Sequence, residues 1–222
     1  MPINENHEKL ISLSGISKKI LLKPYYYEKD IPGAINDCYL REGAVERLLK
    51  AANSLPENYY FLVFDGWRPF RVQMALYENL KKELQEKGLT GEKLNNELAK
   101  YVDYPSVDKN RPSNHLTGGA IDLTIVTDEG FLNMGTGFDD FSKKSRTNYF
   151  EEIMYPNEEE KVIRENRRIL KEVMENVGFT NFDEEWWHYD FGNQNWGMKT
   201  GNDAIYGGIL ELEFKRNFSG VC

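Results

Sequence analysis

The fold is decided by the stretch SNHLTGGAIDLTIV, residues 113–126, in which a polar turn runs directly into an apolar segment. The apolar part, GAIDLTIV, predicts a strand. Because alternate side chains of a strand share a face, one face carries a core-facing row: Gly119, Ile121, Leu123 and Ile125. Asp122 falls on the other face between small neighbours, where a buried carboxylate needs a partner because an unpaired buried charge is costly.

His115 stands seven positions before Asp122, across the pair Gly118-Gly119. Glycine adopts backbone angles that other residues avoid, so this pair permits a bend that folds His115 back over the strand. The stretch taken alone fits two interpretations equally well: His115 and Asp122 belong to a functional site, or His115 is a surface loop residue and Asp122 caps a turn. Both interpretations stay open at the level of this segment.

The pattern of apolar residues outward from this stretch predicts further elements. Helical spacing predicts helices over residues 41–53, 70–87, 92–101 and 157–177. Short aromatic and β-branched runs predict strands over 59–65 and 186–192, and a weak alternation predicts an edge strand over 204–214. Proline, glycine and small polar residues predict loops over 103–118 and most of 127–148. Short strands with long, uneven connections favour an α+β fold over a regular parallel sheet.

Composition bounds the organisation of the chain. Its 222 residues, 29% charged and 40% hydrophobic, are ordinary for a globular protein that buries a core. No internal repeat, low-complexity segment or Pro/Gly/Ser-rich linker divides the sequence. We therefore expect a single domain over residues 1–222, with residues 1–20 as a loosely ordered N-terminal extension.

Charge and cysteine content narrow the function classes. The formal net charge of -8 argues against nucleic acid and anionic membrane surfaces as partners, because both need clustered Lys and Arg. Two cysteines, Cys38 and Cys222, make no disulfide framework and favour a reducing compartment. We find no secretory signal and no apolar stretch of the roughly 18 residues that span a bilayer. A soluble, cytoplasmic protein is expected, and the oligomeric state is not readable.

The chain has only three histidines. His7 lies in a polar terminal segment and is expected to be solvated. His188 lies in DEEWWHYDFG, and a strand histidine between aromatics is by itself more typical of a structural core residue. Taken together, His115, Asp122 and His188 offer two nitrogens and an oxygen, with acids close to the last of them. Three protein ligands with an open fourth position are typical of catalytic zinc, and this mixed set suits zinc.

Four elements of the sequence stand out: Asp65-Gly66-Trp67-Arg68-Pro69, Ser113 to Asp122, Met134 to Asp139, and Glu185-Trp186-Trp187-His188. In this order they resemble elements of D-alanyl-D-alanine dipeptidases of the VanX type, in which the first, second and fourth read DGYRP, SxHxxGxAxD and ExWH. These enzymes belong to a wider group of zinc D-Ala-D-Ala peptidases that shares a core with the zinc-binding domain of Hedgehog proteins. The resemblance spans about residues 25–195. The resemblance implies a small, mostly antiparallel sheet flanked by helices, and Trp67 in place of Tyr is a conservative departure.

The resemblance also implies roles by position. His115, Asp122 and His188 would bind one zinc ion per chain, and Glu185 would be the general base. Strand alternation does not select Glu185, because its odd spacing from His188 puts the two on opposite faces of a regular strand. Alternation favours Glu184 instead, unless Glu185 lies in the turn before the strand.

Three further residues take roles from the resemblance. Arg68 would stabilise charge on the scissile carbonyl, although the sequence alone favours a surface arginine paired with Asp65 or another acid. Ser113 and Asp139 would hold a small dipeptide, with Asp139 facing its free ammonium. The implied reaction is hydrolysis of D-alanyl-D-alanine to two D-alanines by a metal-activated water.

Two rival functions are kept. One is a D,D- or L,D-carboxypeptidase acting on peptidoglycan peptides, which the expected lack of an export signal disfavours. The other is a non-catalytic zinc-binding module, which predicts a missing or misplaced base. The biological purpose also stays open between glycopeptide resistance, in which the dipeptide is removed before it enters cell-wall precursors, and recycling of D-alanine.

Overall fold

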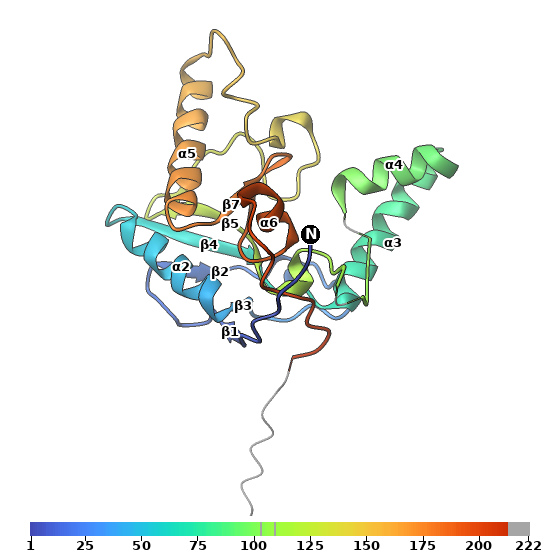
Figure 1. Ribbon diagram of the computed structural model, residues 1–222. Coiled ribbons are helices and arrows are strands. Elements are labelled where there is room, and N and C mark those ends of the chain that lie inside the picture. Colours follow the sequence, from blue (N-terminus) through green and yellow to red (C-terminus); the bar gives the residue numbers. More distant parts are fainter. Residues whose placement is uncertain (103, 109, 213–222) are drawn as a thin grey trace, which may run out of the picture.

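The structure is a computed structural model that describes residues 1–102, 104–108 and 110–212 (Figure 1). Its centre is a six-stranded sheet in the order β2-β4-β5-β8-β7, with β6 paired to β5. The strands are β2 (Ile20–Leu22), β4 (Tyr59–Asp65), β5 (Ala120–Thr127), β6 (Gly130–Phe131), β7 (Thr180–Phe182) and β8 (Glu185–Asp190). Only the β2–β4 pairing is parallel, so the prediction of a mostly antiparallel sheet in an α+β fold is confirmed.

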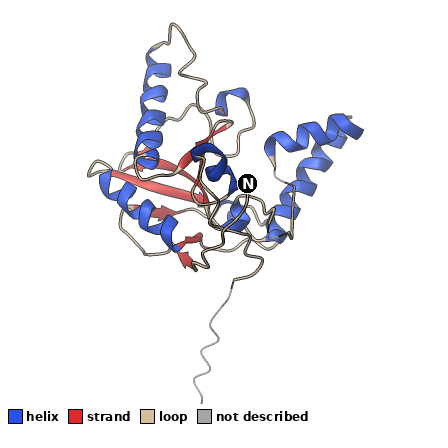
Figure 2. Ribbon diagram, in the orientation of Figure 1, coloured by secondary structure: helices blue, strands red, loops and turns tan. Residues whose placement is uncertain are grey.

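Helices surround this sheet (Figure 2). They are α1 (Tyr25–Glu28), α2 (Glu42–Ser54), α3 (Phe70–Glu86), α4 (Gly91–Tyr101), α5 (Glu158–Glu175) and α6 (Gln194–Thr200). Helices α2 and α5 contact each other and supply side chains to the main core. Helices α3 and α4 project as a hairpin away from the sheet (Figure 1). They pack on each other through a small apolar cluster centred on Leu84, Leu94 and Leu98. None of the described helices is long and apolar enough to cross a membrane.

The predicted core-facing row of β5 is confirmed. Ile121, Leu123 and Ile125 are fully buried in the main core, together with Phe61 and Val63 of the neighbouring strand β4. The opposite face of β5 is covered as well, because Asp122 is only 2% exposed. The carboxylate of Asp122 is therefore buried, as predicted, and needs a positively charged or hydrogen-bonding partner.

The N-terminal segment differs from the expectation of a loosely ordered extension over residues 1–20. Strand β1 (Leu10–Ser12) pairs with β3 (Tyr39–Arg41), and Leu13 is fully buried. Glu5 forms an ion pair with the buried Arg41 at 3.0 Å. Elements of three residues carry no readable periodicity, so these long-range contacts could not be predicted from the local pattern.

Other predicted elements agree within a few residues, with one exception. No strand forms over residues 204–212, where only an isolated bridge joins Ala204 to Ile3, so the predicted edge strand is wrong for the described residues. Residues 213 and 214 of that prediction, and Cys222, lie outside the described residues. The other cysteine, Cys38, is a buried free thiol.

Candidate metal centre and surrounding cavity

The bend before β5 places His115. His115–Thr117 forms one 3-10 turn that ends at Gly118, whose φ of 71° is left-handed and suits glycine. A side chain at Gly118 would also collide with Leu10 of β1. The predicted bend is thus present, and it turns the buried His115 side chain toward the sheet, where its Nδ1 lies 2.8 Å from the carbonyl oxygen of Gly66.

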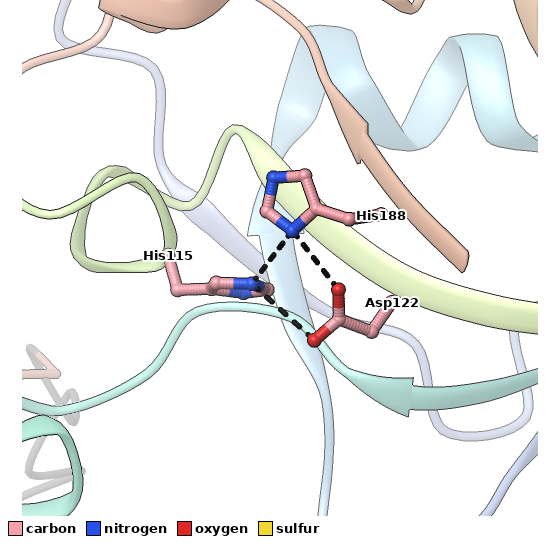
Figure 3. A group of neighbouring side chains, drawn as sticks. All are labelled: His115, Asp122 and His188. Atoms are coloured by element: carbon pink, nitrogen blue, oxygen red, sulfur yellow. Dashed lines mark hydrogen bonds and ion pairs between the residues drawn. The ribbon is translucent and has the colours of Figure 1, made fainter. Parts of the chain in front are cut away.

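Strand pairing brings the other two predicted ligands to the same point. Asp122 of β5 and His188 of β8 are directly opposed across antiparallel strands, so their side chains share a face. His188 Nδ1 lies 3.0 Å from Asp122 Oδ1 and 3.2 Å from His115 Nε2 (Figure 3). His115 Nε2 lies 3.3 Å from Asp122 Oδ2. These three buried side chains form a group that can hold a metal ion.

The spacing of the three donor atoms fits zinc. Bonds of about 2.0–2.1 Å in a tetrahedral zinc site put neighbouring ligand atoms about 3.3 Å apart. The two imidazole nitrogens are 3.2 Å apart, and each lies at a similar distance from its own nearer oxygen of Asp122, Oδ1 at 3.0 Å for His188 and Oδ2 at 3.3 Å for His115, which is close to that spacing. Two imidazoles and a carboxylate also form a donor set that suits zinc, so the residues present fit this metal.

Each histidine has its second ring nitrogen engaged on the side away from this group. His115 Nδ1 donates to the Gly66 carbonyl, which cannot itself donate, so Nε2 keeps its lone pair. His188 Nε2 lies 3.1 Å from Asp190 Oδ1, which leaves Nδ1 free to accept or to ligate. The ring nitrogens on the side of Asp122, His115 Nε2 and His188 Nδ1, are therefore the two that can bind a metal.

Arg68 follows β4 and reaches the same group. An irregularity in β4 after Val63 puts Asp65 opposite Asp122, and Arg68 Nε donates to Asp65 Oδ2 at 2.7 Å. Its Nη2 lies 3.4 Å from Asp122 Oδ2, and its guanidinium stands 4.8 Å from the ring centre of Tyr26. The pairing with Asp65 that the sequence favoured is present, but the arginine is only 8% exposed and is not a surface residue.

An irregularity in the strand pairing puts the side chain of Glu185, and not that of Glu184, beside His188. The pairing of β7 with β8 shifts register between Asn181 and Phe182, so β8 does not alternate regularly here. Asn181 Nδ2 fills the irregular stretch by donating to the carbonyls of Glu185 and His188. As a result Glu185 Oε2 lies 3.9 Å from His188 Nδ1, whereas Glu184 pairs with Arg146.

A cavity of about 190 Å³ adjoins this group. Its lining includes the three candidate ligands, Arg68, Glu185 and Asp139, and the end of α4 supplies one wall. Asp139 has a left-handed φ of 64°, which is uncommon for a residue other than glycine and which occurs at functional sites. Ser113 does not line this cavity. It lines a neighbouring one of about 350 Å³ together with Arg111, and the two cavities share Asn114 and Asn195.

The charged groups in and beside the cavity shift one another's pKa values. Burial would raise the pKa of Asp122, but the two candidate histidine ligands hold it well below its usual value. Burial would lower the pKa of Arg68, but Tyr26 and the two aspartates beside it raise it above its usual value. Burial raises the pKa of Glu185 to about 8 and, with nearby carboxylates, that of Asp139 to about 6. Burial thus favours the protonated form of Glu185 in the metal-free site.

Sequence reasoning missed several residues of the cavity. Tyr26 places its hydroxyl 3.4 Å from Arg68 Nη2, and Gln73 Oε1 accepts from Arg68 Nη1 at 2.9 Å. Neither residue lies in a recognisable motif, and α1, which carries Tyr26, has only four residues. Asp190, which lies behind His188 and does not line the cavity, was also missed but had a usable signal, since it stands two positions after a candidate ligand on the same strand.

Comparisons with known proteins identify a family for this chain. A family model described as D-ala-D-ala dipeptidase matches residues 26–205. The D-alanyl-D-alanine dipeptidase of Synechocystis is 31% identical over 88% of this chain and 87% of its own length. The enzyme of the same name from Enterococcus faecium is 32% identical over 65% of this chain and 68% of its own length.

A solved structure is similar as well. The vancomycin resistance D,D-pentapeptidase VanY, determined in complex with Zn(II), shares 17% identity and a TM-score of 0.47, covering 92% of this chain and 95% of its own. The family match spans most of the present chain, including all seven predicted site residues. The chain therefore belongs to the D-Ala-D-Ala dipeptidase family of peptidases.

Proposed function

We propose that the protein is a zinc-dependent dipeptidase that hydrolyses D-alanyl-D-alanine to two D-alanines. The observation that carries the proposal is the preset spacing of His115 Nε2, His188 Nδ1 and Asp122, at 3.0 to 3.3 Å from one another. Membership of the dipeptidase family supports the type of reaction. The choice of D-alanyl-D-alanine as substrate is taken from the names of the relatives.

The residues around the three ligands have the chemistry that amide hydrolysis needs. A zinc ion bound here would lower the pKa of its water to about 7 and polarise the scissile carbonyl. Glu185 takes the proton of the attacking water and returns it to the leaving nitrogen. Arg68, held by Asp65 and Gln73, presents a fixed cation toward the oxygen on which negative charge develops.

Asp139 supports a free dipeptide rather than a longer peptide. Its side chain shares the cavity with Glu185 and can pair with a free ammonium, which an acylated peptide lacks. The cavity is also small, at about 190 Å³, and α4 closes one side of it. Ser113, which lines the adjoining cavity, remains a predicted contact for the dipeptide.

The decisive assay compares free D-Ala-D-Ala with the same dipeptide acylated at its amine. Efficient cleavage of the free dipeptide and weak cleavage of the acylated one are expected. Cleavage of only the acylated peptide would contradict the dipeptidase assignment and favour a D,D-carboxypeptidase. Zinc binding without cleavage of either substrate would favour a non-catalytic zinc module.

A further inference from the structure

Asp190 is a buried acid behind His188, on the side away from the ligand group. Its Oδ1 lies 3.1 Å from His188 Nε2, and its side chain is only 2% exposed. Among the described residues no lysine or arginine pairs with it. A buried carboxylate without a cation needs several hydrogen bonds, so its position is informative.

Two asparagines hold the carboxylate in place. Asn193 Nδ2 donates to Asp190 Oδ1 at 2.5 Å, and Asn195 Nδ2 lies 3.5 Å from Oδ2. Asn193 is fully buried and also caps α6, because its Oδ1 accepts from the backbone NH of Trp196 at 3.0 Å. The start of α6 thus fixes the orientation of Asp190 independently of His188.

The two histidines of the ligand group are therefore backed by different acceptors. His115 Nδ1 donates to the neutral carbonyl of Gly66 at 2.8 Å and lies 3.4 Å from Asp65 Oδ2, whose charge is already paired with Arg68. His188 Nε2 instead faces a carboxylate that has no lysine or arginine partner among the described residues. A carboxylate behind an imidazole fixes its tautomer and raises its basicity, which strengthens it as a metal ligand. This asymmetry makes His188 the stronger donor of the pair.

We propose that Asp190 is a positioning residue of the metal centre: it keeps His188 in the tautomer with the proton on Nε2 and increases zinc affinity through Nδ1. The inference rests on the proposed zinc site but not on the substrate. Asp190 lies behind the imidazole, so it acts through His188 and not by contact with the reacting atoms.

The first test measures zinc affinity by competition with a chelator in the variant Asp190→Asn. Asparagine keeps the shape and one acceptor oxygen but removes the charge, and loss of such a partner weakens metal binding about 10- to 100-fold. Asp203→Asn is the matched control, because Asp203 is exposed and bonds only to Asn4 among the described residues. It should bind zinc like the wild type. Equal affinity in Asp190→Asn and wild type, with both folded, would overturn the inference.

A second test needs no variant and so does not depend on correct folding of Asp190→Asn. The chain has three histidines, so ¹⁵N spectra of the zinc-loaded protein can assign each ring. His188 should carry its proton on Nε2 and His115 on Nδ1. A zinc-bound His188 with its proton on Nδ1 would overturn the inference. Wild-type protein that binds no zinc would overturn the zinc site as well, whereas normal zinc binding with the wrong tautomer removes only the role of Asp190.

Discussion

Replacing Glu185 by glutamine tests the proposed base with little change of shape. The carboxamide fills the same volume beside His188 but cannot accept the proton of the attacking water. Loss of a general base costs about 10² to 10⁴ in rate, which corresponds to roughly 3 to 5.5 kcal/mol of activation free energy. The kcat for D-Ala-D-Ala should fall by that factor while zinc content is unchanged, because Glu185 is not among the three candidate ligands.

The assay measures D-alanine release at saturating dipeptide, with zinc determined on the same sample. Glu184→Gln is the matched control, since the Glu184 side chain is 52% exposed and pairs with Arg146 outside the cavity. It should keep its rate within about twofold, as surface substitutions usually do. A zinc-replete Glu185→Gln enzyme of normal rate, or loss of activity only in Glu184→Gln, would refute the assignment of the base.

The same variant has a stability consequence in the metal-free protein. Burial raises the pKa of Glu185 from 4.5 to about 8, so the folded state holds a proton that the unfolded chain releases. Its contribution to stability is complete below pH 4.5 and is lost as the pH rises toward 8. At about 1.4 kcal/mol per pH unit, the ceiling of this loss is roughly 5 kcal/mol. Metal-free Glu185→Gln should therefore melt above metal-free wild type at pH 8 but not at pH 5, and a constant difference would contradict the burial argument.

Four further outcomes follow from the site. Arg68→Lys should lower kcat about 10²-fold with zinc retained, because lysine keeps the charge but lacks the rigid, planar set of guanidinium donors that faces the developing oxyanion. An unchanged kcat would exclude that role. Asp139→Asn should raise KM for the free dipeptide about tenfold or more and leave any slow cleavage of the acylated dipeptide unchanged. Since burial raises the pKa of Asp139 to about 6, KM of the wild type should rise as the pH falls below 6, where the carboxylate loses its charge; a flat KM down to pH 5 would contradict this. The increase in Tm on adding zinc should grow from pH 6 to 8, because protons raise the stability of the metal-free site and compete with the metal, and a shrinking increase would contradict it.

The sequence predicted the parts of the site that depend on local pattern. The alternation of β5 put Ile121 in the core and Asp122 on the opposite face, and the Gly118-Gly119 bend brought His115 back to it. The resemblance, and not the strand pattern, pointed to Glu185, and the position of its side chain beside His188 could not be predicted because the irregular pairing of β7 with β8 breaks the period of two on which strand reasoning depends.

Contacts that join distant segments could not be predicted. Tyr26 meets Arg68 across 42 positions, and nothing in its own segment marks it. The N-terminal residues looked unstructured because β1 has only three residues, yet Glu5 pairs with Arg41 and Leu13 is fully buried. Ser113, assigned by motif alone, lies beside the neighbouring cavity, so its contact with substrate still depends on how the dipeptide spans the two.

The most direct test of the zinc dipeptidase measures metal content and hydrolysis of free D-Ala-D-Ala on one preparation, before chelation, after it, and after zinc is restored. We expect one zinc per chain, loss of activity with loss of the metal, and recovery of both together. Protein that cleaves the dipeptide without metal, or that binds zinc fully and leaves the dipeptide intact, would contradict the account.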